Sequence, residues 1–146
     1  MEVSLREMGV FYYYTILDDA NFFIDQAKGL PTVPSSNPLR DRNIRMSILC
    51  SWIALEEVLE FTIEEQDLQK SAPPKPLRNR LDFVLRAMGR TPVEYQVFME
   101  ARKLRNDITH PSEDRQLVSL EEAICTFDFC FGVIKNLSRY EVRLRF

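Results

Sequence analysis

The segment "IRMSILCSWIALEEVLEF", residues 44–61, is apolar on almost every side of the helix that its spacing predicts. Its apolar residues recur at intervals of three and four positions, which is the period of an α-helix. A helix with so little polar surface usually lies at the centre of a protein, where other helices cover it on several sides. We therefore expect a helix over about residues 39–65 to form the centre of the fold.

Three glutamates, Glu56, Glu57 and Glu60, interrupt this apolar segment. Most glutamates in proteins are exposed to solvent, so exposure is the commonest outcome for these three residues as well. A carboxylate beside a buried region needs a cation or a hydrogen-bond donor, because burying an unpaired charge is unfavourable. We expect at least one of the three to lie beside the core and to have such a partner.

Prolines and glycines divide the rest of the chain into further helical segments. Together with the apolar spacing, these breaks predict helices over about 7–29, 77–88, 92–109 and 120–137. Gly29 and Gly89 stand where the first and third helices should end. Two capping boxes, one starting at Thr91 with Pro92 in the first helical position and one starting at Ser119, predict where the last two helices begin.

The fold class expected from these segments is all-α. Only four glycines occur and no Asn-Gly hairpin signal is present, which argues against β-structure. Short loops between helices favour antiparallel neighbours. We expect a four- to five-helix antiparallel up-down bundle that forms a single domain over residues 1–146.

The composition limits the cellular setting and the kinds of site. Hydrophobic residues make up 45% and charged residues 28% of the chain, and no apolar run is long enough to cross a bilayer. The N-terminus lacks the features of an export signal, so we expect a cytoplasmic protein with no membrane partner. With one histidine and no CxxC pair, neither a metal site nor a cofactor is expected. Cys50, Cys125 and Cys130 lie in apolar runs and are expected to be reduced and buried.

Charge is unevenly distributed along the chain. Residues 75–105 hold eight basic and three acidic residues, a surplus of +5, so that the net charge of −3 leaves −8 for the remainder. Solvated helix surfaces are the commonest explanation of such a surplus. The alternative is a path for RNA phosphates, for which Arg102 and Lys103 are the candidates.

The stretch "RKLRNDITHP", residues 102–111, contains the single histidine of the chain. In an unbroken helix His110 would lie about 140° around the axis from Arg105, so the two side chains would point apart. Pro111 disfavours helical backbone at the residue before it, which should free His110 to turn back toward Arg105. A purely structural interpretation remains open, since arginine and histidine are both favoured in the last turn of a helix.

Within this stretch, "LRNDITHP" resembles the signature of the HEPN superfamily, in which an arginine and a following polar residue precede a histidine by a few positions. The four- or five-helix bundle of that family agrees with the helices expected over nearly the whole chain. The resemblance implies metal-independent cleavage of RNA in those members that are enzymes, carried out by a homodimer whose arginines and histidines meet in one cleft. Arg105 and His110 would be the catalytic pair, and Asn106 would orient the site.

The residue types suit that chemistry. Attack of a ribose 2′-hydroxyl on the adjacent phosphorus needs a group that exchanges protons near neutral pH, as imidazole does. It also needs a fixed cation where negative charge accumulates on the phosphate, and the planar guanidinium fits this role. One chain supplies a single histidine, whereas a two-fold dimer would supply both a general base and a general acid.

Two functional hypotheses remain open. The first is an endoribonuclease of a toxin or defence system, for which the resemblance adds an antitoxin or a nucleotidyltransferase as a partner protein. The second is a non-catalytic HEPN-like module that binds a nucleotide or a protein. Family members silenced by nucleotidyltransferases carry a tyrosine two places after the histidine, where this chain has Ser112, which argues against that form of regulation.

Overall fold

The computed structural model describes the backbone of residues 5–109 and 118–138, and the side chains of residues 13–109 and 118–138. The described residues form five helices and no strand, which confirms the all-α fold class. The helices are α1 (Leu5–Gly29), α2 (Asn37–Glu65), α3 (Leu77–Ala87), α4 (Tyr95–Thr109) and α5 (Leu120–Leu137).

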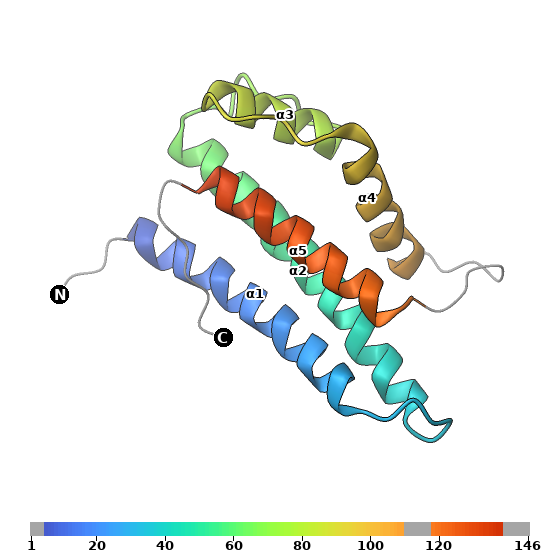
Figure 1. Cartoon of the computed structure of the whole chain (residues 1–146). Helices are drawn as coiled ribbons and strands as arrows, with labels where there is room; N and C mark the ends of the chain where they lie inside the picture. The colour runs from blue at the N-terminus through green and yellow to red at the C-terminus, as the bar shows by residue number, and fades with distance from the viewer. Residues whose placement is uncertain (1–4, 110–117, 139–146) are drawn as a thin grey trace.

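The long helices α1, α2 and α5 lie side by side, and α3 and α4 form an arm beside them (Figure 1). The segment that includes residues 44–61 is indeed central, because α2 contacts each of the other four helices. Within the described ranges, no helix is both long and apolar enough to cross a membrane.

An aromatic cluster joins α2 to the arm and to α5. The Trp52 ring meets the Phe98 ring of α4 edge-on at 5.8 Å between centroids, and it meets the Phe129 ring of α5 at 5.9 Å. Trp52 and Phe98 are almost completely buried. Such T-shaped and tilted contacts are favoured arrangements of aromatic rings, so this cluster holds α4 against α2 and α5.

The predicted start of α4 is wrong. The helix begins at Tyr95 and not at Pro92, and Glu94 is its cap, because its two carboxylate oxygens accept hydrogen bonds from the backbone N–H groups of Gln96 and Val97, each at 3.1 Å. The carbonyl of Thr91 instead accepts a hydrogen bond from the Asn136 side chain of α5. An N-cap residue uses its carbonyl for the first intrahelical hydrogen bond, but the Thr91 carbonyl accepts from Asn136, and Glu94 caps the free amides instead.

The capping box at the start of α5 is confirmed. The Ser119 hydroxyl accepts from the Glu122 N–H at 3.1 Å, and the Glu122 carboxylate accepts from the Ser119 N–H at 3.1 Å. At the end of α3, Gly89 has φ +71, the left-handed conformation expected of a glycine that ends a helix.

Replacing Ser119 by alanine should destabilise the protein by about 1 kcal/mol, because the Glu122 amide then loses its acceptor. Chemical denaturation of the variant and the wild type measures this difference. Ser71→Ala is a matched control, since Ser71 is also exposed but lies in a loop outside any helix cap. Equal stability of the two variants would contradict the assigned role of the capping box.

The prediction that all three cysteines are buried is correct only for Cys130. All three are free thiols, but Cys50 is half-buried and Cys125 is exposed. Cys125 lies where α4 leaves part of α5 uncovered. Burial, with a smaller contribution from the nearby Glu56 carboxylate, raises the pKa of the Cys130 thiol well above its usual value, so Cys130 behaves as a small apolar core residue.

Candidate functional site

The described part of the candidate motif occupies the last turn of α4. Arg105 is half-buried and Asn106 is exposed. The single proton of the Thr109 hydroxyl is shared between the carbonyls of Arg105 and Asn106, at 3.1 and 3.2 Å, as is common for a threonine in the last turn of a helix. His110, Pro111 and Ser112 lie outside the described residues, so the expected contact between Arg105 and His110 falls outside them as well.

Arg105 faces a hollow of about 500 Å³ between α2, α3 and α4. Three arginines and three glutamates line it, so the side chains of its walls carry no net charge. We call it the arginine hollow. Its lining residues are Glu56, Glu57, Glu60, Pro74, Leu77, Arg80, Arg102 and Arg105.

Arg80 uses its guanidinium within the protein. Its Nε and Nη2 donate to the two carboxylate oxygens of Glu60 at 2.8 and 2.9 Å, and its Nη1 donates to the Pro73 carbonyl at 3.0 Å. The hydrogen bond with Glu60 raises the pKa of Arg80. A guanidinium held in this two-pronged way is a poor candidate for binding a ligand, because each of its nitrogens already has an acceptor.

Arg102 is held by α2. Its guanidinium carbon lies 5.9 Å from the centre of the Trp52 ring, within the range of a cation–π contact. Its Nη1 atom is buried and lies 3.5 Å from Glu56 Oε1. These contacts join α4 to the central helix, although the buried Nη1 atom has no hydrogen-bond partner among the described residues.

Arg105 differs from Arg80 because its side chain has no hydrogen bond within the described residues, and from Arg102 because it has no contact with an aromatic ring there. Its Nη2 lies 3.5 Å from Glu56 Oε1, the same oxygen that faces Arg102, and 28% of its side chain is exposed. This distance is longer than that of a hydrogen-bonded ion pair. Among the described residues no acceptor forms a hydrogen bond with the Arg105 side chain, so its N–H groups are available to an anion in the hollow.

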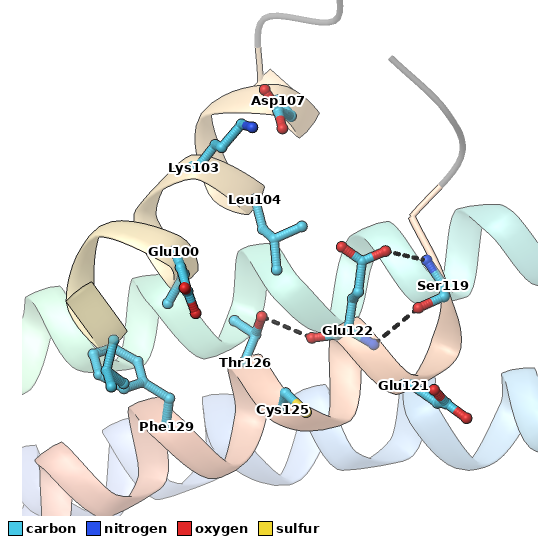
Figure 2. A pocket seen from close by; sticks show the side chains of 12 residues that line it. Glu100, Lys103, Leu104, Asp107, Ser119, Glu121, Glu122, Cys125, Thr126 and Phe129 are labelled. Atoms are coloured by element: carbon cyan, nitrogen blue, oxygen red, sulfur yellow. Dashed lines mark hydrogen bonds between the residues drawn. The ribbon is translucent and has the colours of Figure 1, made fainter.

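Lys103 faces a different part of the molecule from Arg102. It lines a groove of about 490 Å³ between α4 and α5, together with Glu100, Asp107 and Glu121. Figure 2 shows Leu104 pointing from α4 toward α5 across this groove. The two residues expected to bind RNA therefore do not form one surface, and the groove that contains Lys103 has more acidic than basic side chains.

Half of the basic residues in the 75–105 segment have partners within the protein. Arg80, Arg102 and Arg105 face glutamates, and the Arg78 guanidinium lies 4.4 Å from the centre of the Tyr95 ring. The other four are exposed and make no ion pair with the described residues; they are Lys75, Arg86, Arg90 and Lys103. Much of the surplus therefore serves the packing of α3 and α4.

The expectation for the glutamates of α2 is confirmed by Glu56, which is half-buried and faces two arginines. Its spacing in an apolar segment was the signal; the identity of its partners came from the fold.

Within the described ranges, no group of three or more histidine, cysteine or acidic side chains is arranged to hold a metal ion. Searches of protein families, curated proteins and solved structures find no match to this chain.

Proposed function

We propose that this protein is a metal-independent endoribonuclease of the HEPN type, which acts in a toxin or defence system. The observation that supports the proposal best is the state of Arg105, whose N–H groups are available at the wall of a hollow, five residues before the single histidine. The "RNDITH" motif and the all-α fold agree with this proposal.

In the proposed reaction the 2′-hydroxyl of a ribose attacks the adjacent phosphorus. The 2′-oxygen forms a bond to phosphorus and its proton passes to His110, while the bond from phosphorus to the 5′-oxygen breaks. The leaving 5′-oxygen takes a proton from a second acid, which His110 of a second copy would supply in a homodimer. Arg105 would stabilise the negative charge that accumulates on the non-bridging phosphate oxygens. Asn106 would orient the site.

The test is incubation of the purified protein with mixed RNA in EDTA. We expect cleavage to products that end in a 2′,3′-cyclic phosphate, and no cleavage of the same sequences carrying 2′-deoxyribose, because the attacking group is then missing. His110→Ala, purified in parallel, controls for a contaminating ribonuclease. Equal cleavage by His110→Ala and the wild type, or no cleavage of any RNA by the wild type, would contradict the proposal.

A second candidate function is a non-catalytic module that binds a nucleotide or a protein. The charge balance of the arginine hollow favours it, since three glutamates offset the three arginines that an RNA chain would meet. A nucleotide would place its phosphate against Arg105 without the long basic surface that RNA needs. Binding of labelled mononucleotides, without turnover of RNA, would select this candidate.

A further inference from the structure

We propose that Glu56 is the positioning residue that holds the Arg105 guanidinium at the wall of the arginine hollow, in the orientation in which it meets a phosphate. This inference rests on the proposed function for its catalytic meaning, but the contact itself can be tested without any RNA. Glu56 is not part of the "RNDITH" motif and lies on a different helix, forty-nine residues earlier in the chain.

The first observation is that the Glu56 carboxylate lies between two guanidinium groups. Its Oε1 atom lies 3.5 Å from Arg102 Nη1 and 3.5 Å from Arg105 Nη2. Arg102 is itself held over the Trp52 ring, which is 1% exposed. Arg102 therefore places a core-held positive charge beside the Glu56 carboxylate, and the same carboxylate attracts the end of the long, flexible Arg105 side chain.

The second observation is that Glu56 does not fully neutralise the positive charge of Arg105. One carboxylate shared between two guanidinium groups leaves one positive charge in excess among these three residues. The Arg80–Glu60 pair shows the contrasting case, where one carboxylate faces one guanidinium through two hydrogen bonds at 2.8 and 2.9 Å. Arg105 therefore keeps both its charge and its N–H donors, while its position is restricted. A cation that is already in place needs no reorganisation when charge develops on the phosphate.

The Glu56→Gln variant distinguishes a positioning role of Glu56 from the simple effect of its negative charge on RNA binding. Removing a negative charge beside the hollow should leave the binding of RNA unchanged or make it tighter. If Glu56 positions Arg105, the same change should lower kcat by up to about fivefold, because a contact worth up to about 1 kcal/mol favours one position of the guanidinium by at most that factor. We therefore expect a fall in kcat with an unchanged or lower KM. Glu56→Asp keeps the charge with a shorter reach and should retain more turnover than Glu56→Gln.

Glu64→Gln is the matched control. Glu64 is exposed on the same helix, does not line the hollow, and makes no ion pair with the described residues. The kcat and KM of the Glu64→Gln variant should therefore equal those of the wild type. A kcat of Glu56→Gln within twofold of the wild type would overturn the proposal. So would a fall in kcat that Glu64→Gln shares.

Nuclear magnetic resonance of the arginine side chains gives a readout independent of cleavage. The Nε–H signal of Arg105, assigned through Arg105→Lys, should report a restricted side chain in the wild type and a mobile one in Glu56→Gln. The Arg80 signal should stay restricted in both proteins, because Glu60 holds it. Equal mobility of Arg105 in both proteins would overturn the positioning role even if the wild type cleaves RNA. Restriction that is lost in Glu56→Gln would support the role even if the wild type cleaves nothing, in which case only the proposed function fails.

Discussion

Replacing His110 by alanine should abolish measurable RNA cleavage while the protein stays folded, and replacing Arg105 by lysine should impair cleavage far more than it affects stability. Loss of a positioned proton-transfer group typically lowers a rate by about a hundred- to ten-thousand-fold. Lysine retains the charge of Arg105 but lacks the planar, two-pronged grip on a phosphate. Cleavage rates and thermal melts on the same preparations test both variants.

The effect on stability should be small, because the Arg105 contact is weak. An ion pair that is partly exposed contributes roughly 0–1 kcal/mol, and the distance of 3.5 Å to Glu56 is long. A structural role for Arg105 predicts a different result, in which lysine substitutes almost freely. Early melting of both variants, with activity lost in proportion, would assign the motif to the fold and not to the chemistry.

Arg102→Lys is the matched control for Arg105→Lys. Both arginines lie on α4 and face the same oxygen of Glu56. Arg102 also contacts the Trp52 ring, so its replacement should lower stability by about 0.5–1 kcal/mol through the lost stacking. We expect it to impair cleavage much less than Arg105→Lys does. Equal loss of cleavage in the two variants would contradict the special role of Arg105.

The sequence predicted the helices well because each depends on local spacing. The Ser119 capping box and the Gly89 stop involve residues within a few positions of one another, and both are confirmed. The same reasoning was wrong at Thr91, because a contact with Asn136, forty-five residues away, determines its environment. Local signals cannot anticipate such a competition between capping and tertiary contacts.

The sequence predicted which residue types form the candidate site, but not which residues contact one another there. The motif indicated Arg105, but its partner Glu56 comes from another helix, and the apolar segment around Glu56 gave no clue to which cation it would face. Likewise, Arg102 and Lys103 are adjacent in sequence, yet consecutive residues on a helix point about 100° apart. They consequently line different hollows, one beside α2 and one beside α5.

Replacing Trp52 by alanine should destabilise the protein by about 3–5 kcal/mol, the range for removing a large buried aromatic side chain. Trp52 is 1% exposed and contacts the rings of Phe98 and Phe129. For a domain of this size each kcal/mol lowers the melting temperature by roughly 2–4 °C, so the expected shift is about 6–20 °C. Differential scanning calorimetry measures it.

Trp52→Phe is the informative companion variant, because it separates the packing of the ring from the chemistry of the indole. The indole Nε1 atom is buried and has no hydrogen-bond partner among the described residues, so phenylalanine removes an unsatisfied donor as well as some apolar volume. The two effects oppose each other, and we expect Trp52→Phe to be several-fold less destabilising than Trp52→Ala. A melting temperature of Trp52→Ala within a few degrees of the wild type would mean that α4 is not held by this cluster. The position of Arg102, and through Glu56 that of Arg105, would then need another explanation.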